Sequence, residues 1–104
     1  MTSTELFDSA ALEARAAEAS TMLKLLANER RLLILCRIVQ DGEVSVGTLA
    51  QAVGLSQSAL SQHLALLRAD GLLATRRAAQ TVFYRIADAR VERLMTALKN
   101  IYCP

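Results

Sequence analysis

The chain has few aromatic residues, little net charge and no apolar run long enough to cross a membrane. Aromatic residues make up only 4% of its 104 residues, whereas a hydrophobic fraction of 53% consists mainly of Leu, Ala and Val. The longest apolar run, residues 32–36, ends at Arg37, far short of the roughly 20 residues that a membrane span needs. Residues 1–5 lack the basic start and apolar core of a secretion signal. We therefore expect one small cytoplasmic domain with a core of closely packed helices and no membrane partner.

The small charge and the scarcity of metal-binding or nucleophilic side chains argue against several classes of function. A net charge of +2 does not by itself indicate nucleic acid, so any basic surface has to come from local clustering. Two cysteines and one histidine, far apart in the sequence, make a poor transition-metal site, and we expect no metal and no cofactor. Without a Cys-x-x-Cys pair or an acid–base cluster, we expect no enzyme. In a reducing compartment the two thiols are either buried or reactive, and do not form a permanent disulfide.

Capping residues and glycines divide the chain into five expected helices. Residues 1–7 are expected to be a flexible end, and residues 8–104 one folded domain. The first helix, from residue 8 to about 27, has an apolar stripe with spacings of four and three residues, formed by Leu12, Ala16, Ala19, Leu23 and Leu26. Each of the other four helices is expected to begin after an N-cap side chain, namely Asn28, Ser45, Ser56 or Asp88. Between the last two helices, residues 72–77 and 81–86 alternate as two strands around the short loop 78–80.

The two helices on either side of Gly54 predict DNA binding. In a helix–turn–helix, the second helix enters the major groove. Here one face of the second helix is apolar and expected to be buried, and consists of Leu60, Leu64 and Leu67. The opposite face presents hydroxyls, an amide and a methyl group in place of charges: Ser58, Ser61, Gln62 and Ala65. Gln pairs with adenine edges, Ser donates or accepts, and Ala contacts the thymine methyl, so this face suits base edges.

Further candidate contacts lie beside that face. Gln57 stands at the start of the helix, and His63 is either a packed imidazole or a phosphate contact. The arginines of the hairpin are either a clamp on the DNA backbone or solvated charge that keeps the hairpin soluble. Alternation along the strands sets Arg77 and Arg85 apart from Arg76, so these arginines do not all face one groove. The candidate DNA-contacting residues are Ser56, Gln57, Ser58, Ser61, Gln62, His63, Arg68, Arg76, Arg77 and Gln80.

Three runs carry a resemblance to the ArsR-type winged helix–turn–helix repressors. They are Leu-Ala-Asn-Glu-Arg-Arg-Leu at residues 26–32, Leu-Ser-Gln-Ser-Ala-Leu-Ser-Gln-His-Leu at 55–64 and Asp-Gly-Leu at 70–72. The resemblance implies a mainly α, winged helix–turn–helix fold with about five helices and a two-stranded wing. It further implies a homodimer joined by the first and last helices, and binding to double-stranded operator DNA of two-fold symmetry until an inducer is sensed. Ala78 and Ala79 depart from the family pattern, which often has Gly at the wing tip, and Thr48 replaces a common Glu.

The cysteines resemble those of the dithiol subgroup typified by BigR, SqrR and HlyU, which sense sulfide-derived or oxidising species. Leu-Ile-Leu-Cys at residues 33–36 and Ile-Tyr-Cys at 101–103 carry this resemblance. It implies that sulfane sulfur or an oxidant links Cys36 to Cys103 through a disulfide or polysulfide bridge, and that the bridge weakens operator binding.

Two alternatives to this switch stay open. By periodicity, Cys36 belongs to an expected buried stripe with Leu32, Leu35 and Val39, and Cys103 ends a helix, so both thiols also fit an inert role. The chain is then a repressor that responds to a different ligand, either a metal or a small molecule. The other alternative is a winged-helix module that binds protein.

Overall fold

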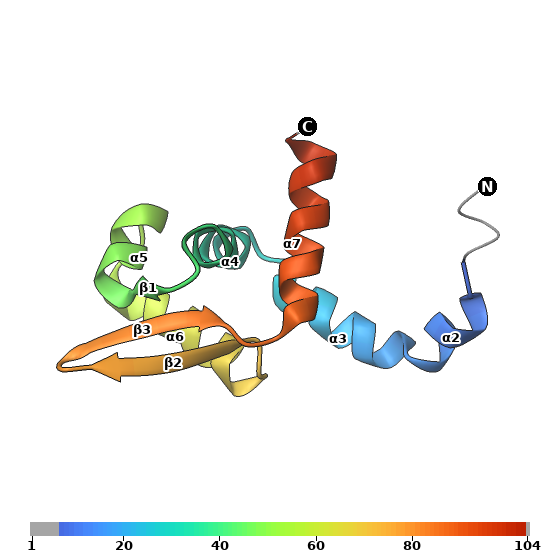
Figure 1. Cartoon of the computed structure of the whole chain (residues 1–104), viewed down its shortest axis with the longest axis horizontal. Helices are drawn as coiled ribbons and strands as arrows, with labels where there is room; N and C mark the ends of the chain where they lie inside the picture. Colours follow the sequence, from blue (N-terminus) through green and yellow to red (C-terminus); the bar gives the residue numbers. More distant parts are fainter. Residues whose placement is uncertain (1–6, 104) are drawn as a thin grey trace.

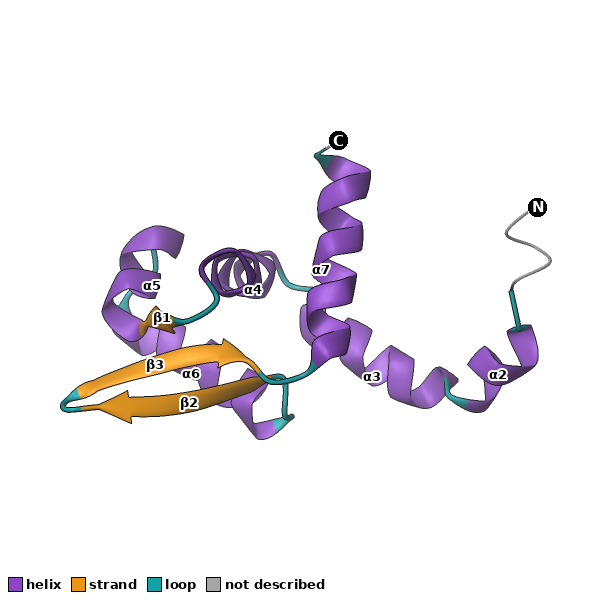
Figure 2. Cartoon of the chain, in the orientation of Figure 1, coloured by secondary structure: helices purple, strands orange, loops and turns teal. Residues whose placement is uncertain are grey.

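A computed structural model describes residues 7–103, so the expected flexible end lies outside the described residues except for Phe7. The described part contains six helices and a three-stranded antiparallel sheet, which confirms a mainly α, winged helix–turn–helix fold (Figures 1 and 2). The elements in chain order are α2 (Ser9–Ala14), α3 (Ala16–Leu26), α4 (Glu29–Asp41), β1 (Val44–Ser45), α5 (Val46–Val53), α6 (Gln57–Ala69), β2 (Leu73–Ala78), β3 (Thr81–Ile86) and α7 (Ala89–Tyr102).

The expected N-caps set the starts of four helices. A side-chain oxygen of Asn28, Ser45, Ser56 or Asp88 accepts a hydrogen bond of 2.9–3.2 Å from a main-chain N–H two or three residues further on. Each bond satisfies one of the N–H groups that a helix start leaves without a partner. Gly54 ends α5 in the left-handed conformation, with φ of 68°, which costs glycine little. This residue therefore makes the turn between α5 and α6.

Two expected elements differ from the structure. The first helix is broken at Arg15, whose φ of −117° and ψ of 16° separate α2 from α3. The expected two-stranded wing has a third strand, because Val44 and Ser45 pair with Tyr84 and Phe83 of β3. The strand order is β1-β3-β2, and β2 and β3 pair from Leu73 opposite Ile86 to Ala78 opposite Thr81. The third strand ties the hairpin to the start of α5.

The core surrounds α4, which contacts α5, α7 and β3, and it includes the inner face of α6, which contacts α5 and β2. Its fully buried side chains are Ile34, Leu35, Ile38, Leu49, Leu60, Leu64, Leu67 and Val91. The prediction that Cys36 lies on the buried stripe of α4 is wrong, since its side chain is exposed. Consecutive residues of an α-helix are rotated by about 100° around its axis, so a stripe centred on Ile34, Leu35 and Ile38 leaves Cys36 on the far side.

The molecule is elongated, with extents of 51 × 29 × 22 Å. In Figure 1 the hairpin points to one end and α2 and α3 extend to the other, while α7 rises between them. Much of the apolar stripe of the expected first helix is exposed in the single chain: Leu12 is 49% and Leu23 55% exposed. Leu26, the last residue of the stripe, joins the core together with Met22 of α3.

Candidate nucleic-acid interface and thiol pair

The expected DNA-facing side of α6 is on the surface. Leu60, Leu64 and Leu67 are buried, as the helical wheel predicts. The opposite face is exposed throughout, and includes Ser58, Ser61, Gln62 and Ala65. These four side chains are uncharged, take part in none of the side-chain hydrogen bonds among residues 7–103, and present hydroxyl, amide and methyl groups to solvent. The helix can therefore offer hydrogen-bonding groups to a ligand without first breaking contacts of its own.

His63 lies beside that face and has a defined partner. Its Nδ1 accepts a hydrogen bond of 3.3 Å from Nε of Arg31, a residue in the first turn of α4. The imidazole is half-buried. His63 is therefore packed against α4, with the side chain of Arg31 as its hydrogen-bond partner.

The arginines of the hairpin divide into two groups. Arg76 forms an ion pair with Glu43, with N···O distances of 2.6 and 3.2 Å, and its guanidinium lies 4.8 Å from the ring centre of Phe83. The hydrogen bond from Arg76 lowers the pKa of the Glu43 carboxyl. Arg77 points to the other side of the sheet, paired with Val82, and makes no ion pair within the described range.

The register corrects the grouping of these arginines. Arg76 pairs with Phe83, and Arg85 is two residues from Phe83 on the same strand. Residues opposite each other, or two apart on one strand, share a face of the sheet. Arg85 therefore shares its face with Arg76, and the prediction that placed it with Arg77 is wrong.

A recess lies between the start of α6 and the tip of the hairpin. Its volume is about 390 Å³, and its lining includes Gln57 of α6 and Gln80 at the tip, two candidate DNA contacts. Ser45, Val46 and Gly47 at the start of α5 complete one wall. Ala79, at the tip, has a positive φ of 56°, which shows that the hairpin keeps a left-handed turn residue without glycine. The fold thus brings Gln57 and Gln80 to one hollow.

The two thiols are not brought together. Cys36 and Cys103 are both free and exposed, and they do not lie near each other. Cys103 ends α7 at the tip that points away from the rest of the molecule (Figure 1). Arg37, next to Cys36 in the sequence, is engaged by Asp41 at 2.8 Å; its Nε–H is not well aligned with that carboxylate, so the contact is an ion pair rather than a good hydrogen bond. The expectation that helix packing alone holds the thiols within bonding reach is wrong for this single chain.

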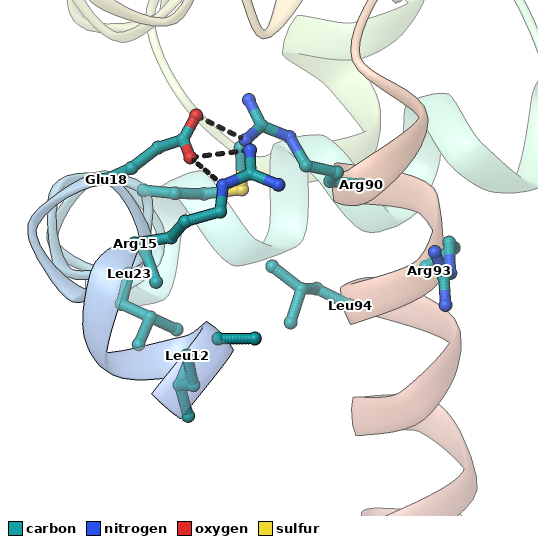
Figure 3. A pocket seen from close by; sticks show the side chains of 10 residues that line it. Leu12, Arg15, Glu18, Leu23, Arg90, Arg93 and Leu94 are labelled. Carbon is teal, nitrogen blue, oxygen red and sulfur yellow. Dashed lines mark hydrogen bonds and ion pairs between the residues drawn. The ribbon is translucent and has the colours of Figure 1, made fainter. Parts of the chain in front are cut away.

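An apolar groove separates α2 and α3 from α7. Its volume is about 470 Å³, and its apolar lining comes from Ala11, Leu12, Ala19, Met22, Leu23 and Leu94. Figure 3 shows Leu12 and Leu23 on one side and Leu94 on the other. The exposed apolar surface continues to the end of α7, where Ile101 is 66% and Tyr102 77% exposed.

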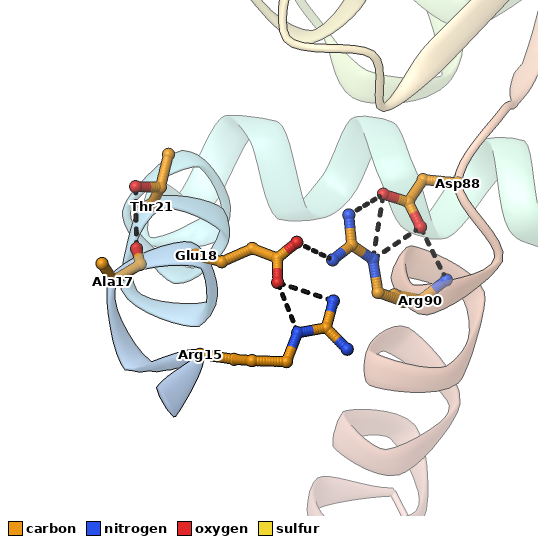
Figure 4. Close-up of polar contacts among 6 residues, drawn as sticks. All are labelled: Arg15, Ala17, Glu18, Thr21, Asp88 and Arg90. Carbon is orange, nitrogen blue, oxygen red and sulfur yellow. Dashed lines mark hydrogen bonds and ion pairs between the residues drawn. The ribbon is translucent and has the colours of Figure 1, made fainter. Parts of the chain in front are cut away.

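Ion pairs join α3 to α7 at the edge of the groove (Figure 4). Arg90 donates to both oxygens of Asp88, at 2.7–3.2 Å, and to Glu18 of α3 at 3.2 Å. Glu18 also accepts a hydrogen bond of 2.7 Å from Arg15. These hydrogen bonds, above all those from Arg90 to Asp88 and from Arg15 to Glu18, lower the pKa of both carboxyls. The same partners raise the pKa of Arg90.

Residues 7–103 contain no group of three or more His, Cys, Asp or Glu side chains that could hold a metal ion. In the same part of the chain, no helix has both the length and the apolar character for crossing a membrane.

Two hydrogen-bond partners on this surface could not be recognised from the sequence. Glu43 lies 33 residues from Arg76, and Arg31 lies 32 residues from His63. Patterns of helical or strand spacing reach only a few residues along the chain, so neither pair leaves a signal at such separations. Recognition of β1 as a third strand would have placed Glu43 beside the hairpin that carries Arg76.

The chain is similar in sequence and in structure to known bacterial regulators. The family model described as "Bacterial regulatory protein, arsR family" matches residues 28–75. The transcriptional activator HlyU of Vibrio cholerae is 52% identical over 92 residues, which cover 88% of this chain and 84% of HlyU. The structure of reduced HlyU from Vibrio cholerae N16961 has a TM-score of 0.83 and covers 89% of this chain and 97% of that one, at 52% identity.

A second solved structure, the transcriptional repressor BigR from Xylella fastidiosa, is 40% identical. It has a TM-score of 0.88 and covers 94% of this chain and 99% of that one. The similarity to both regulators extends over most of each chain and includes α4 to α6, where the candidate DNA contacts lie. The chain belongs to the arsR family of bacterial regulatory proteins.

Proposed function

We propose that this regulator is a cytoplasmic repressor that binds a two-fold-symmetric operator as a homodimer, with α6 in the major groove. The exposed, uncharged and hydrogen-bonding face of α6 carries this proposal, because a helix with no ligand normally shows charged side chains to water. Gln62 and Ser61 address base edges, while Ser56, Ser58 and Gln57 stand near the start of α6, where recognition helices approach the DNA. One relative is called an activator and another a repressor; we propose repression.

The hairpin is the second point of contact. Arg77 has no partner among residues 7–103 and is available to a phosphate, whereas Arg76 is already bound to Glu43. Gln80 and Gln57 line one recess, so a phosphate group there would touch the wing and α6 together. Arg68, exposed in the last turn of α6, adds a further positive charge. Of the candidate wing arginines, Arg77 is therefore the clamp and Arg76 supports the hairpin.

A second copy of the chain covers the apolar groove between α2–α3 and α7. Leu12, Leu23, Ile101 and Tyr102 are large apolar side chains left exposed on these helices in the single chain. Exposed apolar surface of this extent on a small domain usually marks an interface. A two-fold axis through this surface also supplies two copies of α6 to two half-sites, as a symmetric operator requires.

The inducer acts through Cys36 and Cys103. One thiol takes a sulfur atom from a sulfane-sulfur donor and becomes a persulfide. The other thiol attacks its inner sulfur, so that a disulfide forms, hydrogen sulfide leaves and the two electrons from the thiols reduce the transferred sulfur atom. When the oxidant is hydrogen peroxide, the two electrons from the thiols reduce the peroxide to water as the disulfide forms. The family relationship to a regulator solved in a form called reduced supports redox control.

Bridging requires the end of α7 to move. The last buried residue of α7 is Met95, so Ile101, Tyr102 and Cys103 extend beyond the core of the single chain. The main-chain N–H of Cys103 donates to Lys99 at 2.8 Å. A bridge from Cys103 to Cys36 of α4 would displace the last turn of α7 and so change the dimer surface that continues along this helix. The two copies of α6 in the dimer would then no longer match the spacing of the operator half-sites.

The test measures sulfur linkage and DNA affinity in the same samples. The DNA is a duplex that the reduced protein selects from a random pool, and the treatments are a persulfide donor, hydrogen peroxide and buffer alone. We expect a mass change confined to the peptides of Cys36 and Cys103, together with loss of binding. The variants Cys36→Ser and Cys103→Ser should bind the duplex and ignore both treatments. Normal release from either variant would overturn the thiol switch.

The separation of the thiols favours one other candidate. If both are inert, the chain is a repressor that responds to a different ligand. Such a repressor would keep its full response in cells carrying both Cys→Ser substitutions, which the thiol switch does not allow.

A further inference from the structure

The side chain of Arg31 connects three helices. Arg31 lies in the first turn of α4, its Nη1 donates to the main-chain oxygen of Leu25 in α3 at 3.3 Å, and its Nε donates to Nδ1 of His63 in α6 at 3.3 Å. Both bonds are part-buried. One guanidinium therefore touches the last turn of α3 and the middle of the candidate recognition helix.

Each partner has a reason to need this donor. Helix α3 ends at Leu26, so the oxygen of Leu25 lies among the last carbonyls of the helix, which find no N–H within it. Arginine cannot give up its proton, so in this pair the imidazole must be the acceptor at Nδ1. A neutral imidazole that accepts at Nδ1 carries its hydrogen on Nε2. The contact with Arg31 thus fixes the tautomer of His63 as well as the direction of its ring.

We infer that Arg31 is a positioning residue for DNA binding, which holds α6 in a set orientation to α3 by tying His63 to the end of α3. The inference rests on the proposed function, in which α6 reads DNA and α3 belongs to the dimer surface. The two recognition helices of a dimer must match two half-sites at once, so their orientation relative to the dimer surface governs affinity. Lysine could not replace Arg31, because a single ammonium group lacks the planar pair of donors that reach both partners.

Two substitutions of His63 separate this role from a direct phosphate contact. His63→Asn places an amide oxygen near the position of Nδ1 and so keeps an acceptor for Arg31, while it removes the outer nitrogen. His63→Gln places its amide near the position of Nε2 and leaves the Nδ1 position empty. Arg31→Gln removes the link from the other side, and Arg31→Gln combined with His63→Gln tests whether the two changes act on one interaction.

Affinity is measured by fluorescence anisotropy on the duplex that the unaltered protein selects. Loss of one hydrogen bond corresponds to about a fivefold weaker contact for each half-site, and so to about 25-fold weaker binding of the dimer to the duplex. We expect this loss from Arg31→Gln, from His63→Gln and, without further increase, from the double variant, whereas His63→Asn should lose less affinity than His63→Gln. The slope of log affinity against log salt concentration should not change in Arg31→Gln, because the inference gives Arg31 no phosphate contact. A phosphate contact would contribute about one unit of slope. Thermal unfolding of each variant shows how much of any loss comes from instability.

A spectroscopic signature gives a second measurement. His63 is the only histidine of the chain, so its ring ¹⁵N resonances need no assignment. We expect the Nε2–H tautomer in the unaltered protein and a mixture of tautomers in Arg31→Gln. Normal affinity in both Arg31→Gln and His63→Gln, or loss only in His63→Asn, would overturn the inference and leave DNA binding intact. Failure of the unaltered protein to select any duplex would instead overturn the proposed function, while the tautomer measurement would still test the Arg31–His63 pair.

Discussion

Replacing Arg77 by alanine should make DNA binding less sensitive to salt. Each phosphate contact contributes about 0.9 to the slope of log affinity against log salt concentration. A dimer places two copies of Arg77 on the operator, so the variant should lose about 1.8 units of slope. Between about 50 and 200 mM salt, a fourfold rise, the affinity of the unaltered protein should therefore fall about 12-fold more than that of Arg77→Ala.

Arg76→Ala is the matched control, because it removes the same charge from the neighbouring position. Arg76 is held by Glu43 at 2.6 Å and lies over Phe83, so its loss should weaken the hairpin and leave the slope close to that of the unaltered protein. The assay is fluorescence anisotropy with a labelled duplex at several salt concentrations. If Arg76→Ala flattens the slope as much as Arg77→Ala, or if Arg77→Ala leaves it unchanged, the division of the arginines by face of the sheet is wrong.

Three further predictions concern α6, α7 and the wing tip. Gln62→Ala should relax base preference at one position of each half-site by about 1–3 kcal/mol with little change of salt slope, as selection from a random pool would show; an unchanged consensus would contradict it. Asp88→Ala should cost about 1 kcal/mol of unfolding free energy through the lost N-cap, whereas Asp88→Asn keeps the cap and loses only the ion pair with Arg90. Because Arg90 lowers the pKa of Asp88, the ion pair contributes fully to the free energy of unfolding above the ordinary pKa of the carboxyl, and this contribution is lost as the pH falls through the lowered value. Denaturant unfolding should therefore show that the difference in stability between Asp88→Asn and the unaltered protein disappears in acid. A difference that does not change with pH would exclude the ion pair as its source. Ala79→Gly should stabilise the protein by about 0.5–1 kcal/mol, because the positive φ of 56° costs alanine more than glycine; a lower melting temperature would contradict the left-handed turn.

Local signals in the sequence were sufficient to predict most of the elements. A cap acts over two or three residues, so Asn28, Ser45, Ser56 and Asp88 could be recognised from the chain alone. The buried face of α6 followed from spacing, since Leu60, Leu64 and Leu67 recur at helical intervals. These features depend on neighbours in the sequence, and the structure confirms them.

Features that depend on distant neighbours could not be predicted in this way. Cys36 fits the spacing of a buried stripe, but the side of α4 that is buried carries Ile34, Leu35 and Ile38, and α4 contacts α5, β3 and α7. β1 is too short, at two residues, to show alternation. Leu12 and Leu23 belong to an apolar stripe in the sequence, and in the single chain both are exposed. In the proposed dimer, the second copy of the chain supplies the surface against which this stripe packs.

The central claim is that α6 lies in the major groove of a two-fold-symmetric site. Methylation interference on the selected duplex tests it most directly, since methylation of guanine N7 adds a group only in the major groove. The account predicts that N7 methylation blocks binding at two clusters about one helical turn apart, with mirror symmetry about the centre of the site. Interference confined to adenine N3 in the minor groove, or to a single cluster, would contradict it.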